Sequence, residues 1–90
     1  MNNARPKPLS SAQIRAARAL IRWSAEDLAR ASSVGVTTIR RAELTVEITS
    51  LTTANDQTIR RALELAGVEF IDENGGGPGV RLRKSAKQKR

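Results

Sequence analysis

The amino-acid sequence predicts a mainly α fold, in which a small bundle of four helices is followed by a C-terminal β-hairpin. Up to about residue 67, apolar residues recur at helical spacing, and Ser or Thr stands where such segments begin. From residue 68 onward, two short runs of strand-forming residues flank a glycine-rich segment, which is typical of a hairpin. The length of 90 residues allows one small domain.

The composition indicates a protein without catalytic activity. The chain has no Cys, His or Tyr, so it lacks a thiolate and the commonest general base and metal ligand. Its acids form no obvious pair for general acid–base catalysis, and we expect no enzyme, no cofactor and no metal. No apolar run reaches the ~18 residues that span a bilayer and no signal peptide is recognisable. We therefore expect a cytoplasmic protein without membrane contact.

The net charge of +7 is concentrated at the two ends of the chain. Of the 16 Lys and Arg residues, six follow Val80 and two, Arg5 and Lys7, lie within the first eight residues, which leaves eight against nine acids in between. We expect residues 1–8 to form a flexible arm and residues 84–90 a disordered basic tail. These ends indicate nucleic-acid binding, or else tails that only solubilise the chain or coat nucleic acid non-specifically.

The first helix is predicted to begin at Ser10 or Ser11, because a serine hydroxyl accepts a hydrogen bond from a free backbone N–H of the first turn. Its apolar face follows from helical spacing and consists of Ile14, Ala17, Leu20 and Ile21. A basic stripe, interpreted as solvated, lies beside that face and consists of Arg15, Arg18 and Arg22. Trp23 comes directly afterwards, and we interpret it as a packing wedge between the first two helices.

The second helix is predicted to begin with a capping box, in which Ser24 and Asp27 exchange hydrogen bonds. Leu28 and Ala29 face inward from this helix. The stretch from Ser32 to Gly35 then breaks it, and Val34 is the apolar residue of the bend that should enter the core. Gly35 can serve as the N-cap of a third helix.

The third helix, residues 36–42, presents a polar face that cannot be buried. If Ile39 is its buried anchor, then at ~100° per residue Thr37 and Arg41 point away from the core. Thr38 and Arg40 flank them, and Val36 lies at the edge. Threonine and valine methyl groups can contact thymine, and arginine can bind the two acceptors of guanine. The predicted DNA-binding residues are Val36, Thr37, Thr38, Arg40 and Arg41.

Three segments together resemble the Cro/CI-type (XRE) helix-turn-helix family of transcriptional regulators. They are Ile14–Arg18, Trp23–Ala29 and Val34–Glu43, and the resemblance extends over about residues 10–66. It implies a lambda-repressor-like bundle that binds DNA as a homodimer. It also implies base contacts from Val36, Thr37, Thr38 and Arg41, with Arg40 on a phosphate. The chain departs from the family at Ala25, where many members have a Gln that holds a phosphate.

The rest of the helical part is less regular. Between Leu44 and Thr53 we expect an irregular loop that inserts one or two side chains into the core. The fourth helix is predicted to begin near Thr52 or Thr53 and to end at Ala66, before Gly67. Its apolar face consists of Ile59, Ala62, Leu63 and Ala66, whereas Arg60 and Arg61 are interpreted as solvated.

The C-terminal hairpin is predicted from strands at Val68–Ile71 and Val80–Arg83, joined by residues 72–79. A two-stranded hairpin is marginal alone, so it should either pack on the helices or pair with a second copy. This divides the chain into a helix-turn-helix domain, residues 9–67, and a hairpin, residues 68–83, that we interpret as a dimerisation element.

The function expected from these features is that of a bacterial sequence-specific DNA-binding transcriptional regulator, a repressor that binds a palindromic operator as a homodimer through the helix 36–42. Two copies would place these helices in successive major grooves of double-stranded DNA, about 34 Å apart. Control would come from protein level, autorepression or a protein partner. An alternative is a protein–protein interaction module that antagonises another regulator. A third hypothesis is non-specific nucleic-acid coating through the basic ends.

Overall fold

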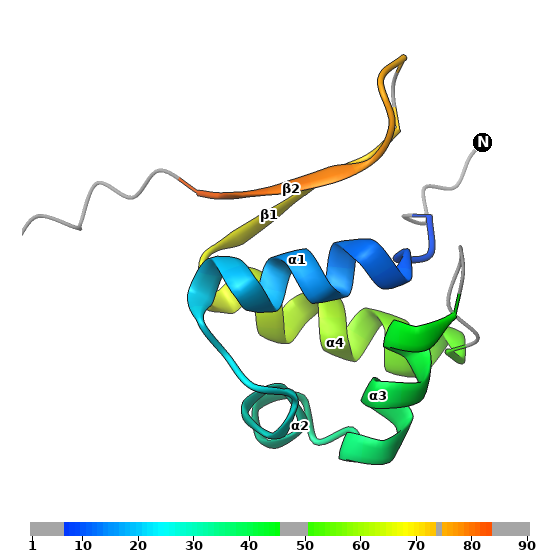
Figure 1. Ribbon diagram of the computed structural model, residues 1–90, viewed down its shortest axis with the longest axis vertical. Helices are drawn as coiled ribbons and strands as arrows, with labels where there is room; N and C mark the ends of the chain where they lie inside the picture. The colour runs from blue at the N-terminus through cyan, green and yellow to red at the C-terminus, as the bar shows by residue number, and fades with distance from the viewer. Residues whose placement is uncertain (1–6, 46–50, 74, 84–90) are drawn as a thin grey trace, which may run out of the picture.

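Four helices and a two-stranded hairpin form the part of the chain that the computed structural model describes, residues 7–45, 51–73 and 75–83 (Figure 1). The helices are α1 (Ser11–Ile21), α2 (Ala25–Ser32), α3 (Val36–Leu44) and α4 (Thr53–Leu65). The strands β1 (Val68–Ile71) and β2 (Gly79–Leu82) follow. The predicted fold class is therefore confirmed.

Side-chain caps explain where α1, α2 and α4 begin. Ser10, not Ser11, caps α1: its hydroxyl accepts from the Gln13 backbone N–H, and the Gln13 side chain accepts from the Ser10 N–H, which forms a second capping box. The hydroxyl of Thr52 accepts from the Asn55 N–H at the start of α4. Ser11 is buried instead, and its hydroxyl donates to the Thr45 carbonyl at 2.6 Å.

The core lies where α1, α2, α3 and α4 meet the first residue of the hairpin. Its fully buried large side chains are those of Leu9, Ile14, Leu28, Ile39, Ile59, Leu63 and Val68. Trp23 packs against this core as predicted, and Val34 is buried in the bend. The expected apolar face of α1 is wrong at Leu20, which is 38% exposed. The reason is that Leu20 lies about 120° from Ile14 around the helix, at ~100° per residue.

The hairpin packs on the helices, as one of the two predicted arrangements requires. Figure 1 shows it crossing α1 on the side opposite α2 and α3, and both strands contact α1. Val68 pairs with Leu82 and Ile71 with Gly79 in antiparallel register. The Gln13 amide nitrogen donates to the Gly79 carbonyl at 3.1 Å. The side chain of a capping residue thus also fastens the hairpin to α1.

Several predicted boundaries differ from the structure, among them the end of α4, which is Leu65 and not Ala66. Strand β2 begins one residue early, because Gly79 already pairs with Ile71, and Arg83 lies beyond the strand. Helix α3 continues to Leu44, beyond the predicted end at Ala42, and Leu44 is 84% exposed. Of the predicted loop, Leu51 is partly buried against the core, as expected for one of its side chains. Residues 46–50 of the loop lie outside the described residues, as do residues 1–6 of the arm and the tail 84–90.

Arg60 on α4 was interpreted from the sequence as solvated, and this interpretation is wrong. Its guanidinium lies 5.0 Å from the centroid of the Phe70 ring on β1, and it donates to the Lys7 carbonyl at 2.8 Å. Arg60 therefore helps to hold the hairpin and the chain before α1 against α4. Arg61, by contrast, is exposed as predicted. Among the described helices, none has the length and apolar character needed to cross a membrane.

Candidate nucleic-acid interface

The orientation of α3 is determined by the bend that joins it to α2. Helix α2 ends at Ser32 and is followed by its C-cap Ser33, whose backbone is left-handed (φ 61°). Helix α3 begins after Gly35, which caps it without a side-chain hydrogen bond. Within the bend Val34 is buried, and one turn further on Ile39 is fully buried. These two anchors fix which face of α3 points outward.

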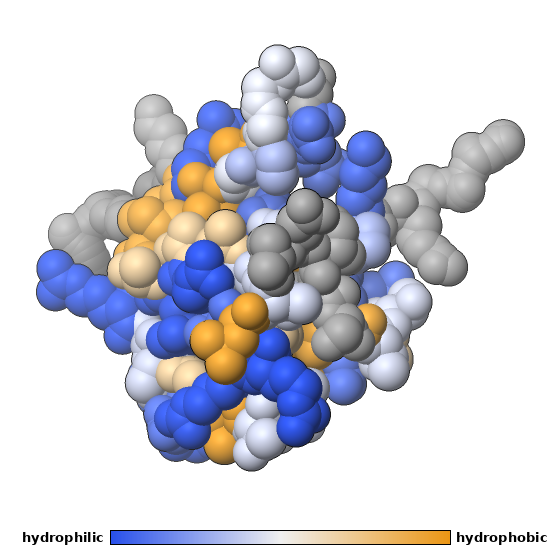
Figure 2. Space-filling view, turned by 45° about the vertical axis from the view of Figure 1, so that its right-hand side comes forward, coloured by the Kyte–Doolittle hydropathy of each residue, from blue (hydrophilic) through white to orange (hydrophobic). Residues whose placement is uncertain are grey.

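The five predicted site residues fall into two groups by solvent exposure. Thr37, Arg40 and Arg41 are exposed on α3, whereas Val36 and Thr38 are half-buried. Val36 packs against the edge of the core. Figure 2 shows that the lower part of the molecule, where α2 and α3 lie in Figure 1, is largely hydrophilic. The outward face of α3 is therefore a polar surface with Thr37 and Arg41 at its centre.

The two arginines of this face differ in their partners. Arg40 forms an ion pair with Glu26 of α2, with 2.5 Å between Nη2 and Oε2, and both side chains are 55% exposed. For Arg41, the described residues provide no side-chain hydrogen bond and no ion pair. Within the described residues, Arg41 is thus the arginine of this face whose donors are not used by another side chain.

The start of α2 is acidic. Asp27 accepts from the Ser24 N–H at 2.9 Å, which confirms the predicted capping box, and it also pairs with Arg30. Hydrogen bonding to the Ser24 backbone lowers the pKa of Asp27. The pKa of Glu26 is lowered by its own backbone N–H and then by Arg40. The first turn of α2 therefore carries two ionised carboxylates, while Ala25 beside them is buried and has no polar side-chain atom.

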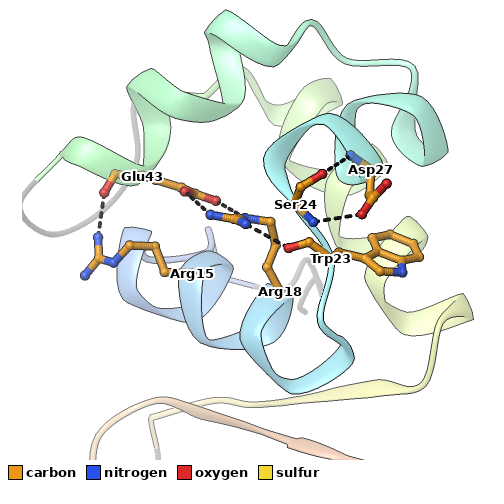
Figure 3. Close-up of polar contacts among 6 residues, drawn as sticks. All are labelled: Arg15, Arg18, Trp23, Ser24, Asp27 and Glu43. Carbon is orange, nitrogen blue, oxygen red and sulfur yellow. Dashed lines mark hydrogen bonds and ion pairs between the residues drawn. The ribbon is translucent and has the colours of Figure 1, made fainter.

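In the basic stripe on α1, Arg18 is half-buried and not solvated, which corrects its interpretation, whereas Arg15 is exposed but also forms a hydrogen bond (Figure 3). Arg18 donates from Nε and Nη2 to the two carboxylate oxygens of Glu43, at 2.7 and 2.8 Å, and from Nη1 to the Trp23 carbonyl at 2.8 Å. Arg15 donates to the Glu43 carbonyl at 2.5 Å. The hydrogen bonds that Arg18 donates to the Glu43 carboxylate raise the pKa of Arg18. Arg22 is exposed, as predicted.

This junction joins the end of α3 to α1, and its key residue is Glu43, which is buried. Helical spacing already places Glu43 on the same side of α3 as Ile39. A carboxylate on a buried face needs a charged partner, so the sequence indicates that Glu43 has a cationic partner but does not identify it as Arg18. Each carboxylate oxygen of Glu43 accepts one hydrogen bond from Arg18, which satisfies the buried acid in the last turn of α3.

A separate open cleft of ≈ 590 Å³ lies between the end of α4 and β1. It is lined by Arg61, Glu64, Leu65, Val68, Glu69, Phe70 and Arg83. None of the five predicted site residues takes part in it. In the described part of the chain, no three acidic, His or Cys side chains come together as metal ligands would.

Comparison of the chain with models of protein families finds no match, and comparison with curated proteins finds none either.

Proposed function

We propose that the chain is a sequence-specific DNA-binding transcriptional regulator, a repressor of the Cro/CI-type (XRE) class that its sequence resembles. The observation that supports this most is the outward face of α3. Thr37 and Arg41 are exposed opposite the fully buried Ile39, and the Arg41 guanidinium is not engaged by the described residues. A helix with one buried and one free polar face, preceded by a capped helix and a tight bend, suits insertion into the major groove.

In this proposal Thr37 and Arg41 carry most of the base readout. Their spacing of four residues places them one helical turn apart, within reach of neighbouring base pairs. Arg41 offers two parallel N–H donors to the O6 and N7 acceptors of guanine, and Thr37 offers a methyl group and a hydroxyl. Val36 and Thr38, half-buried at the start of the helix, add contacts at its edge.

A homodimer on a palindromic operator is the second part of the proposal. One such helix contacts only a few base pairs, whereas two copies about 34 Å apart read two half-sites together. The hairpin end supports a dimer contact, because Leu65 at the end of α4 and Leu82 on β2 are 82% and 52% exposed. Leu65 also lines the open cleft between α4 and β1, and exposed apolar surface of this kind is where protein contacts form.

One observation favours a second candidate, a protein–protein interaction module that antagonises another regulator. The face built by α2 and α3 carries Glu26 and Asp27 beside its arginines, and Leu44 at its far end is 84% exposed. Acids repel phosphates, and an exposed leucine suits a protein surface. This candidate predicts that little DNA affinity remains when residues 1–6 and 84–90 are removed, whereas a regulator retains its sequence preference.

The test is to select bound duplexes from a random pool and to measure their binding by fluorescence anisotropy. Arg41→Ala should reduce discrimination between the selected and an unrelated sequence by about 1–3 kcal/mol, because the guanine contact is lost. Arg61→Ala is the matched control, since Arg61 is an exposed arginine on α4 and the charge change is identical. An unaltered preference in Arg41→Ala would contradict its assignment as the base reader. If the wild-type chain selects no sequence, the proposed function is wrong.

A further inference from the structure

Glu26 and Arg40 join the two helices of the bend on their solvent side. Glu26 is in the first turn of α2 and Arg40 is in the middle of α3, so the pair spans 14 residues of sequence. The contact between Nη2 and Oε2 is 2.5 Å, and 55% of each side chain is exposed. Arg40 is therefore at the surface, but its positive charge faces a carboxylate.

The surroundings of this pair increase the negative charge at the start of α2. Asp27 follows Glu26 directly, and its carboxylate is held by the Ser24 N–H. Ala25 offers no side-chain donor to a phosphate. A DNA strand that approaches this end of α2 meets two carboxylates that are each paired with an arginine, Glu26 with Arg40 and Asp27 with Arg30. A phosphate contact there requires a free cation or a free N–H group.

We propose that Glu26 restrains Arg40 and so limits the sequence-independent attraction of the chain to DNA. The inference rests on the proposed function and replaces the phosphate contact that the family resemblance implies for Arg40. Arg40 bound to Glu26 does not neutralise a phosphate, so affinity depends on the bases that Thr37 and Arg41 contact. The Glu26 carboxylate also repels the DNA phosphates directly. Because every duplex carries the same phosphates, this repulsion does not depend on base sequence.

The expected gain in DNA affinity follows from the salt dependence of phosphate contacts. Each phosphate that a protein neutralises contributes about 0.9 to the slope of log affinity against log salt. A freed Arg40 should therefore steepen the slope by about one and raise affinity on the order of tenfold near 0.1 M salt. Because phosphate contacts do not depend on base sequence, the selected and the unrelated duplex should gain equally.

The experiment measures the affinity of the full chain for both duplexes over a range of salt concentrations. Glu26→Gln should bind both about tenfold more tightly, with a steeper salt dependence. In the Glu26→Gln background Arg40→Ala should remove most of this gain, because the freed cation is lost, and the part that remains measures the repulsion by Glu26 itself. Glu69→Gln is the matched control, because Glu69 pairs with Arg81 on the hairpin in a similarly exposed ion pair, at 3.0 Å.

Three outcomes would overturn the inference. Weaker or less selective binding by Glu26→Gln would show that Glu26 positions Arg40 for base readout. A loss of salt dependence by Arg40→Ala in the wild-type chain would show that Arg40 already contacts a phosphate. A similar gain in Glu69→Gln would show that only net charge matters. A wild-type chain that binds no duplex would instead overturn the proposed function as well, so the two failures are distinguishable.

Discussion

Helix α3 is attached to its neighbours by two arginine–glutamate pairs that differ mainly in burial. The inner pair, Arg18–Glu43, joins α3 to α1, and its side chains are 22% and 9% exposed. The outer pair, Arg40–Glu26, joins α3 to α2, and each of its side chains is 55% exposed. The comparison shows that one kind of ion pair can fix the position of a helix where it is shielded and contributes little to stability where it is exposed.

The geometry of the inner pair supports a structural role. Both Glu43 carboxylate oxygens accept from Arg18, whose third nitrogen binds the Trp23 carbonyl, while Arg15 binds the Glu43 carbonyl (Figure 3). Bidentate pairs of this kind are geometrically specific. The outer pair is joined by a single hydrogen bond between side chains in contact with solvent, where water and salt weaken the attraction.

The largest effect is expected from Glu43→Gln, which keeps the shape of the side chain but removes its charge. Arg18 would then be left partly buried without a counter-charge, and we expect the free energy of unfolding to fall by about 3 kcal/mol. Urea denaturation followed by circular dichroism measures this loss. Glu26→Gln is the matched change in the outer pair, and its urea midpoint should stay close to that of the wild-type chain. Equal losses in the two variants would contradict the distinction by burial.

A smaller effect is expected from Ser24→Ala, which removes the N-cap of α2, the helix that carries Glu26 of the outer pair. Its effect on the free energy of unfolding is measured by urea denaturation. The variant loses the hydroxyl that accepts from the Asp27 N–H, which should reduce stability by about 1 kcal/mol. Thr53→Ala is the control, because Thr53 is an exposed hydroxyl residue in the first turn of α4 that is not its N-cap. A loss in Thr53→Ala as large as in Ser24→Ala would mean that the cap is not the cause.

The pH dependence of the same cap has a defined direction. The pKa of Asp27 is lowered in the folded chain, mainly by the Ser24 backbone. Its contribution to stability is therefore present above the ordinary pKa of an aspartate and is lost as the pH falls through the lowered folded value. Urea midpoints of Asp27→Asn and the wild-type chain should accordingly converge only in acid, below the ordinary aspartate range.

The sequence predicted the parts of this arrangement that depend on local rules. Helical spacing identified Ile39 as the buried anchor of α3 and Thr37 and Arg41 as its outward residues, and the Ser24–Asp27 capping box is readable within four positions. Strand propensity and the glycine-rich turn were sufficient for the hairpin. These features depend on residues close together in the chain, so spacing and residue type carry the information.

The ion pairs could not be predicted in the same way, because each joins residues that only the fold brings together. Arg15 and Arg18 differ little from Arg22 in sequence, yet only the first two bind Glu43. Arg40 could equally have remained free, as Arg41 does within the described residues. Leu20 was wrongly assigned to the buried face of α1 for a related reason. Helical spacing groups residues over a wide arc of the helix, and the neighbouring helices cover only part of that arc.

The smallest effect is expected from Glu69→Gln, which breaks the third arginine–glutamate pair far from α3. The Arg81 and Glu69 side chains are 64% and 45% exposed. If burial determines the contribution of an ion pair, this pair should contribute as little to stability as the outer pair Arg40–Glu26. The hairpin keeps its backbone register and the Gln13 bond to Gly79, and we therefore expect no measurable shift in the urea midpoint. A clear destabilisation would show that strand pairing, and not burial alone, determines how much such a pair contributes. A midpoint equal to that of Glu26→Gln would instead extend the rule from helices to the hairpin.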